Sequence, residues 1–399
     1  MRDTFVAGLR CPACGGEHSF TLCAQERDER EWREGLLRCR VCTREFRVHR
    51  GVPELLYEPP EHILLEAAGL ERFAEVMVAS GWNRETVLAL PNVEHGYWYV
   101  QARSMHQLLT TVPFHAGNSV LDVGSNTCWA ANHFAERGLS AIALDIATTE
   151  LQGLYTADYF LDEGRVFFER VLGSMDSIPL ASSSIDYVYC CEVLHHNDPH
   201  GLRRTFAEIF RVLRPGGRLC IVNETLKTLR DPHGVNVEGV EQFEGYEHAH
   251  WALGYRLAAI RAGFLTEVTE PHYRPFFGDA EYAPRPDAGP LAGRIGRAGF
   301  SLRRIGLVRR LYLAWLNHVW GGVSLNMIAT KPRRYVGRHE RMATPERLLR
   351  TGLAGLRDLV NRLRGRAPAR LPRTPEQAQR MMLELPAPTG SRPPSAPSG

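Results

Sequence analysis

The sequence has almost no lysine: of its 48 basic residues, only Lys227 and Lys331 are lysines. An arginine bias that runs through the whole chain is a feature of composition, so arginine abundance alone does not indicate phosphate binding. The small net charge of +3 hides an asymmetry, because residues 331–399 hold 15 basic and 5 acidic residues. That net +10 leaves a net −7 for residues 1–330. We therefore expect an acidic folded body with a basic tail, and 44% apolar residues exclude a wholly disordered chain.

Long hydrophobic runs and an export signal are also missing. The first residues, MRDTFVAGLRCPAC, contain no apolar core of signal-peptide length. The uncharged stretch 311–330 is long enough to cross a bilayer, but it contains glycines, asparagines and a histidine, so no span is expected. We expect a cytoplasmic protein, with contact at the inner face of the membrane as an open alternative.

Four of the nine cysteines form two Cys-x-x-Cys pairs, Cys11 with Cys14 and Cys39 with Cys42. Without an export signal, this pattern favours a metal over disulfides. Two thiolates separated by two residues can share one tetrahedral Zn²⁺, and four thiolates leave no open position, so the zinc would be structural. Cys23 lies outside this spacing and is expected to pack in the interior.

The segment after the second pair, EFRVHRGVPELL, alternates at Phe46 and Val48 and turns at Gly51 and Pro53, which predicts a strand and a turn. With the two cysteine pairs it resembles the small zinc-ribbon family that activates RNA and protein methyltransferases in trans. The resemblance implies a zinc ribbon over residues 1–58.

Residues 59–110 are expected to form a helical linker and a lid. Apolar residues recur there at helical spacing, at Ile63, Leu64, Ala67, Leu70 and Phe73. The aromatic segment around Trp98 is interpreted either as a cofactor lid or as a buried aromatic cluster, and both remain open.

The next segment reads as a β-α-β unit. Residues 119–123 form an apolar strand, Gly124 begins a turn, a helix follows, and residues 141–145 form a second strand that ends in Asp145. A carboxylate about 20 residues past the turn is placed to accept hydrogen bonds from ribose hydroxyls. Only one of the three glycines of the dinucleotide-binding pattern is present, which argues against NAD or FAD.

The sheet is predicted to continue through strands at 166–171, 186–191 and 218–223, with a helix over 199–213 that ends at Pro-Gly-Gly. The segments GSMDSIPL, IDYVYCCEVLHHNDP and FAEIFRVLRPGG resemble class I S-adenosylmethionine-dependent methyltransferases, in the group that includes the ubiquinone-biosynthesis C-methyltransferases. The resemblance implies an α/β fold: a Rossmann-like seven-stranded methyltransferase sheet over residues 111–332, with helices on both faces.

By position, the resemblance also implies the cofactor site. Asp122, Gly124 and Asn126 would line the methionine and ribose side of S-adenosylmethionine. Asp145 would hold the ribose hydroxyls, and Met175 would flank the adenine.

Two departures from the family pattern affect this site. Cys128 replaces the last glycine of the turn, and Ser174 replaces the acid that contacts adenine, for which Asp176 is the candidate substitute. A copy that does not bind the cofactor is therefore an alternative. The acids at the two strand ends are retained, which favours a working site.

Four histidines are expected on the substrate side, near the carboxyl edge of the sheet where Glu224 ends a strand. Imidazole titrates near neutrality, so one of them could accept a proton from the acceptor. His196 and His248 are the first candidates for a catalytic base, and His195 is the third; His250 completes the group. Methyl transfer depends mainly on positioning, so a site without a dedicated base is an alternative.

The C-terminal third is less regular. Residues 323–330 resemble the last strand of the family, which makes residues 276–320 an insertion. Within it, 301–320 is an arginine-rich amphipathic segment, for which packing on its own domain is favoured over a membrane surface. Residues 333–399 are expected to form a basic helical tail with a disordered end, open to RNA, anionic lipid or a partner protein.

The sequence therefore predicts an S-adenosylmethionine-dependent methyltransferase acting on a small-molecule, lipid-linked or glycan-linked acceptor. One alternative is an rRNA or tRNA methyltransferase, which the acidic body makes less favoured. Another is a zinc-ribbon scaffold or activator of a second methyltransferase. The oligomeric state is not indicated.

Overall fold

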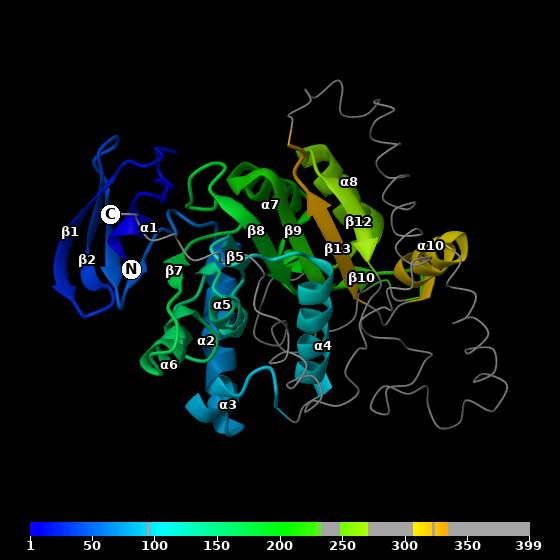
Figure 1. Cartoon of the computed structure of the whole chain (residues 1–399), viewed down its shortest axis with the longest axis horizontal. Coiled ribbons are helices and arrows are strands. Elements are labelled where there is room, and N and C mark those ends of the chain that lie inside the picture. Colours follow the sequence, from blue (N-terminus) through cyan, green and yellow to red (C-terminus); the bar gives the residue numbers. More distant parts are fainter. Residues whose placement is uncertain (94–95, 231, 233–247, 270–305, 321–323, 334–399) are drawn as a thin grey trace, which may run out of the picture.

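The computed structural model describes residues 1–93, 96–230, 232, 248–269, 306–320 and 324–333. Seven of the described strands form one mixed sheet, in the order β12-β13-β9-β8-β5-β6-β7 (Figure 1). The bounds of these strands are β5 Ser119–Val123, β6 Ser140–Asp145, β7 Glu169–Leu172, β8 Ile185–Cys191, β9 Leu213–Glu224, β12 Leu265–Thr269 and β13 Leu325–Thr330. The five neighbouring strands β9, β8, β5, β6 and β7 run parallel to one another. Strand β13 lies antiparallel to both of its neighbours, β12 and β9. The predicted Rossmann-like seven-stranded sheet is confirmed.

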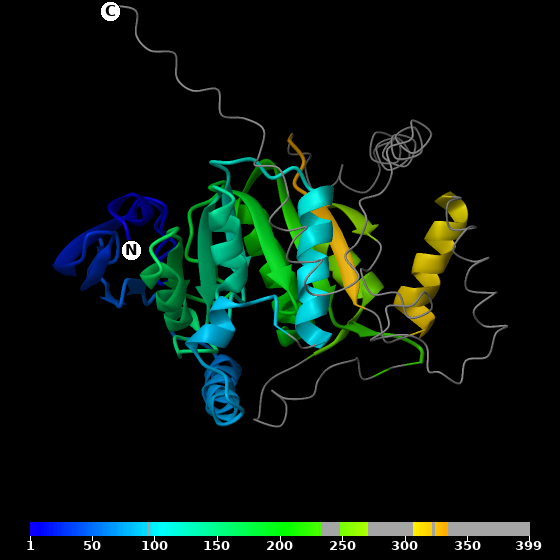
Figure 2. The same ribbon diagram turned by 60° about the horizontal axis from the view of Figure 1, so that its bottom comes forward.

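Helices cover both faces of the sheet, because its central strands are apolar on both sides. Helices α4 (Gly96–Thr111), α5 (Trp129–Glu136) and α6 (Ala157–Asp162) pack on the face that carries Val120 and Tyr189. Helices α7 (Pro199–Val212) and α8 (Ala252–Ala262) pack on the other face, against Leu121 and Val188. Figure 2 shows α4 lying across the front of the sheet. The carboxyl ends of the parallel strands are therefore left as the edge where a site can form.

The N-terminal segment forms a separate four-stranded antiparallel sheet, in the order β1-β2-β3-β4. Its elements are α1 (Asp3–Val6), β1 (Phe20–Arg27), β2 (Trp32–Cys39), β3 (Glu45–His49) and β4 (Val52–Pro53). The small sheet lies against the β7 end of the large sheet (Figure 1). The backbone N–H of Leu55 donates to the carbonyl of Leu172 (2.9 Å), and that of Ala181 donates to Gly8 (2.8 Å). The two sheets also share one hydrophobic cluster, so they pack as a continuous body.

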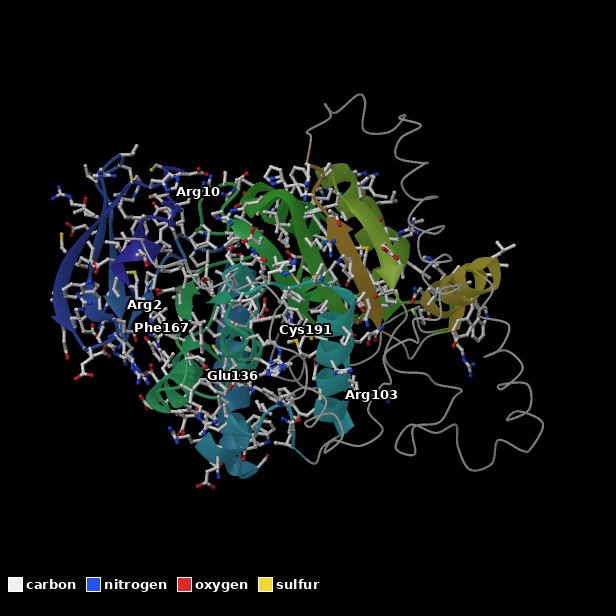
Figure 3. All side chains as sticks on the ribbon, viewed as in Figure 1. Arg2, Arg10, Arg103, Glu136, Phe167 and Cys191 are labelled. Atoms are coloured by element: carbon white, nitrogen blue, oxygen red, sulfur yellow. The ribbon has the colours of Figure 1, made fainter. Side chains whose placement is uncertain are left out.

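A buried charge network closes this junction. Arg170, on β7, has no exposed side-chain surface, and its guanidinium pairs with Glu31, in the loop between β1 and β2, and with Asp158 of α6 (2.8 Å to Asp158). Arg33 and Arg50 also bond Asp158, at 3.1 and 2.8 Å. Figure 3 shows Arg2 beside Phe167 at the same junction, where the guanidinium lies 3.7 Å from the ring centre. Each buried acid thus has a cation partner.

The linker residues are helical as predicted, in α2 (Glu61–Ala79), α3 (Arg84–Leu88) and α4. The buried face of α2 differs from the apolar pattern, because Leu64 is 54% exposed while Glu66 is buried. The Glu66 carboxylate lies 3.0 Å from Nδ1 of His196, a contact that the apolar pattern does not mark. Cys23 is exposed on β1, so the expectation that it packs in the interior is wrong.

Some of the observed element boundaries differ from those predicted from the sequence. The strand expected at 166–171 is β7, which begins at Glu169 because its pairing with β6 starts there. Helix α7 begins as expected for Asp198 followed by proline, since the Asp198 carboxylate accepts the N–H of Gly201. Of the predicted insertion, only 306–320 is described, as α10 (Gly306–Trp315) and a π-helical turn (Leu316–Trp320). The predicted tail helix and disordered end lie outside the described residues.

Candidate functional site

The turn after β5 closes over the end of β6. The backbone N–H groups of Gly124 and Ser125 donate to the carbonyl of Leu144, and that of Asn126 donates to the Asp145 carboxylate at 2.8 Å. Gly124 has φ +67°, and a Cβ there would lie 2.3 Å from a methyl group of Val193. Only glycine fits this position, so the single glycine that the sequence retains is the one that the turn needs.

The two non-glycine residues of the turn keep its unusual backbone. Asn126 has φ +46° and Cys128 has φ +59°, both in the left-handed region. Asparagine visits this region readily, whereas a cysteine does so at some cost in strain. Cys128 is fully buried at the start of α5. Cys128 therefore holds a left-handed conformation that a glycine would adopt without this strain.

Two buried acids line the turn. Asp145 is 6% exposed and accepts the N–H groups of Asn126 and Ala147, whereas Asp122 accepts the Ser125 hydroxyl at 2.6 Å. Burial raises the pKa of Asp145 to about 6, against the lowering effect of those N–H groups. Burial likewise raises the pKa of Asp122 to about 7, and the charge of Asp145 adds to the rise. The two buried carboxylates would be stabilised by a cationic ligand.

The loop after β7 carries the two other predicted cofactor residues. The Met175 sulfur accepts from the Asn197 amide at 3.3 Å. The Asp176 carboxylate accepts the Ser174 hydroxyl at 2.6 Å and pairs with Arg204 of α7 at 2.9 Å. Asp176 thus already has partners on both oxygens in this structure, while Met175 joins the loop to the histidine segment.

A histidine–carboxylate pair lies at the carboxyl ends of β8 and β9. The Nδ1 of His195 is 2.7 Å from Oε1 of Glu224, which is fully buried at the end of β9. Glu224 also accepts the backbone N–H groups of Val193, Leu194 and His195. Burial raises the pKa of Glu224, but the charge of His195 and these hydrogen bonds outweigh it and hold the pKa below its usual range. An ionised Glu224 makes Nδ1 of His195 the hydrogen-bond donor, so in the neutral imidazole the lone pair lies on Nε2.

The other predicted histidines gather around this pair. The ring centres of His195 and His196 are 4.3 Å apart, and Nδ1 of His196 lies 3.0 Å from Oε1 of Glu66. The backbone N–H of His248 donates to the carbonyl of His195 at 2.5 Å. His250, which begins β11 (His250–Trp251), bonds the Asn197 carbonyl through Nε2 at 2.7 Å. Burial lowers the pKa values of His248 and His250.

Part of this chain is similar to known methyltransferases. A family model described as a methyltransferase domain matches residues 121–221, which hold the turn, both buried acids, His195 and His196. The methyltransferase GfsG of Streptomyces halstedii is 31% identical over 199 residues, which cover 45% of this chain and 69% of that protein. The chain belongs to the class I S-adenosylmethionine-dependent methyltransferases.

Two further relatives are similar to this chain over shorter stretches. An uncharacterised methyltransferase of Mycobacterium tuberculosis is 36% identical over 110 residues, 28% of this chain and 41% of its own length. A sterol 24-C-methyltransferase of Schizosaccharomyces pombe is 32% identical over 119 residues, 29% of this chain and 30% of that protein. The part of this chain that matches thus spans about two fifths of the length of the mycobacterial relative.

In the methyltransferase, the aromatic segment before β5 lies over the start of α5. The ring of Trp98 contacts Trp82 (centres 5.9 Å apart) and Trp129 (6.2 Å). Further along α4, Gln101 accepts hydrogen bonds from Cys191 and Asn223, at the ends of β8 and β9; Figure 3 shows Cys191 beside α4. The aromatic cluster is therefore present, and the same helix reaches the ends of the catalytic strands.

The four paired cysteines meet at one point of the small sheet. Their sulfur atoms all lie within 4.8 Å of one another, with 3.7 Å between Cys11 and Cys42 and between Cys14 and Cys39. Zn–S bonds of about 2.3 Å in a tetrahedron put sulfurs about 3.8 Å apart, so the four thiols fit a tetrahedral metal. Each knuckle ends in a left-handed residue, Gly15 or Thr43, whose N–H donates back to the first cysteine of its pair.

Sequence reasoning missed Glu66 and did not pair Glu224 with His195. Glu66 lies on a helix outside the family's sheet, and no motif marks it. Glu224 was placed at the end of a strand, but its partner depends on the register of β9 against β8.

Proposed function

We propose that this methyltransferase moves the methyl group of S-adenosylmethionine to a nucleophilic oxygen, nitrogen or carbon of a small apolar or lipid-linked acceptor. The observation that carries the proposal is the ordered pair of His195, after β8, and Glu224, at the end of β9. The buried acids that suit the cofactor lie in the same sheet, on β5 and β6. The relationship to a sterol methyltransferase supports an apolar acceptor.

One group of residues in this chain would bind the cofactor, and another would accept the proton. The turn at Gly124 and the carboxylate of Asp145 hold the cofactor, which supplies an electrophilic methyl group on a sulfonium when bound. Nε2 of His195 would accept the proton that the acceptor nucleophile loses. Glu224 keeps the imidazole in the correct tautomer and stabilises the imidazolium that results.

The experiment uses the full-length protein, S-adenosylmethionine labelled in the methyl group, and lipid, aqueous and RNA fractions of cell extract. Label is expected to pass into the lipid or small-molecule fraction, and the Glu224→Gln protein is expected to transfer it at least about tenfold more slowly. Label found only in RNA would overturn the proposed acceptor class.

Cofactor affinity is expected to depend on pH through Asp145. A ligand that prefers the ionised carboxylate binds more tightly as pH rises through the free-site pKa of about 6. The dissociation constant for S-adenosylmethionine should therefore be about tenfold larger at pH 5 than at pH 8. In Asp145→Asn the affinity at pH 8 should fall at least about tenfold, the effect of one charged hydrogen bond, and the slope near pH 6 should disappear. An unchanged slope in Asp145→Asn would contradict the role of Asp145.

The cofactor should also change how the stability of the protein depends on pH. Folded carboxylates with raised pKa values bind more protons than the unfolded chain between pH 3.8 and about 7. These two acids therefore destabilise the unliganded protein as pH rises through that interval. A cationic ligand lowers both pKa values and removes this cost.

We also propose that the four clustered cysteines hold one structural zinc ion. Metal analysis of the purified protein should then find one zinc per chain. Cys39→Ser should lose the metal and lower the melting temperature by at least about 5 °C, since a structural zinc contributes folding free energy directly. The matched control is Cys23→Ser, because Cys23 is exposed outside the cluster. Equal metal content in the two variants would contradict the assignment.

A further inference from the structure

An apolar stripe runs along the outer side of α10 and the turn that follows it. Leu307 is 66% exposed, Leu311 63%, Trp315 36% and Val319 38%. Residues four apart lie on one side of an α-helix, so Leu307, Leu311 and Trp315 share a side of α10, and Val319 is exposed on the π-helical turn that follows. Large apolar side chains that are exposed in a row, rather than singly, indicate a contact surface.

The helix that carries the stripe is fixed to the protein. Leu313 and Asn317 are buried on its inner side. The backbone N–H of Leu229 donates to the carbonyl of His318 at 2.9 Å, and that of Arg230 donates to Val319 at 3.1 Å. The stripe therefore faces outward because the opposite side of the helix is held.

The positive charge of residues 301–320 indicates an anionic binding partner. Residues 301–320 include four arginines, at 303, 304, 309 and 310, and no aspartate or glutamate. An apolar face with aromatic residues on a segment of positive charge suits the interface of an anionic bilayer, where tryptophan is favoured. None of the described helices is long and apolar enough to cross a membrane, so the contact would lie along its surface.

The position of the stripe relates it to the catalytic pair. Leu229, which bonds the π-helical turn, follows Glu224 by five residues, at most about 18 Å of extended chain. The small sheet lies at the opposite end of the molecule from α10 (Figures 1 and 2). A bilayer against α10 would thus be close to the acceptor side and would leave the cysteine cluster in water.

We propose that the stripe Leu307–Leu311–Trp315–Val319 is a membrane-surface contact for bilayers that contain anionic lipid. The inference goes beyond methyl transfer, because the contact needs neither cofactor nor turnover. It brings the acceptor side to the surface on which an apolar acceptor would be dissolved.

The test is co-sedimentation of the full-length protein with vesicles, without cofactor. One set of vesicles is phosphatidylcholine alone, and the other includes roughly a quarter phosphatidylglycerol. The wild type should bind the phosphatidylglycerol vesicles, and high salt should weaken that binding. Leu307→Ser/Leu311→Ser should bind at least about tenfold more weakly, because the apolar area that enters the interface is removed.

The matched control is Leu64→Ser/Leu65→Ser on α2, where the two leucines are 54% and 45% exposed on a helix that contains four glutamates and one arginine. This control should bind vesicles as the wild type does. Equal loss in both double variants, or no wild-type binding to phosphatidylglycerol vesicles, would overturn the proposal. So would a concentration-dependent dimer that Leu307→Ser/Leu311→Ser makes monomeric, since the stripe would then bind a second copy. Vesicle binding without any methyl transfer would leave this inference standing and count only against the proposed function.

Discussion

Replacement of His195 by glutamine is expected to lower the turnover number by about 100- to 10,000-fold, the usual contribution of a general base. Glutamine can still donate a hydrogen bond to Glu224, so the loop should keep its fold, but it cannot accept a proton at neutral pH. Cofactor affinity should change little, because the buried acids and the turn at Gly124 are untouched. Rates at saturating acceptor, together with calorimetric cofactor affinities, provide the measurement.

The control for this prediction is His196→Gln. His196 stacks on His195 and also faces a carboxylate, Glu66, but that carboxylate comes from the linker helix α2. We expect a loss of less than about tenfold in turnover, since only His195 has its tautomer fixed by an acid on a catalytic strand. A larger loss for His196→Gln than for His195→Gln would assign the base to His196 instead.

Replacement of Arg170 by methionine is expected to destabilise the protein by about 3–5 kcal/mol, because it leaves Glu31 and Asp158 buried with one cation fewer. Methionine fills much of the volume of the arginine stem, so the effect comes from charge rather than from a cavity. Burial raises the pKa of Asp158, but Arg33, Arg170 and Arg50 outweigh it and keep the pKa below its usual value, so the acid stays charged. Denaturant unfolding of wild type and variant measures the difference.

Arg84→Ala is the control, because Arg84 forms an ion pair with Glu163 that is about 40% exposed on both sides. Such a surface pair contributes about 0–1 kcal/mol. If Arg170→Met were no more destabilising than Arg84→Ala, the charge network would not be what joins the small sheet to β7.

Several elements could be predicted from sequence because their signals are local. The strand Ser119–Val123 has the bounds that its apolar run indicates, since it is buried on both faces. The cysteine cluster follows from two short spacings, and Asp145 follows from its place at the end of a strand. In each case the residues that decide the structure lie within one element or one turn.

The features that were missed depend on partners far apart in the chain. The apolar period of α2 favours Leu64 as a buried residue, but Leu64 is exposed, and Glu66 is buried with its carboxylate beside His196, 130 positions along the chain. Arg170 lies in a four-residue strand, ERVL, whose pattern does not reveal that its arginine is buried beside Val171. Its two acids come from the loop between β1 and β2 and from α6, and only the assembled fold brings them together.

Calorimetric titration of the full-length protein with S-adenosylmethionine at pH 8 tests the central claim most directly. The turn at Gly124 and the two buried acids should bind the cofactor at one site per chain, and Asp145→Ala should weaken that binding at least about tenfold. Absence of binding by the wild type would contradict the account and would indicate a degenerate site on a scaffold. Wild-type affinity in Asp145→Ala would show that the cofactor binds elsewhere.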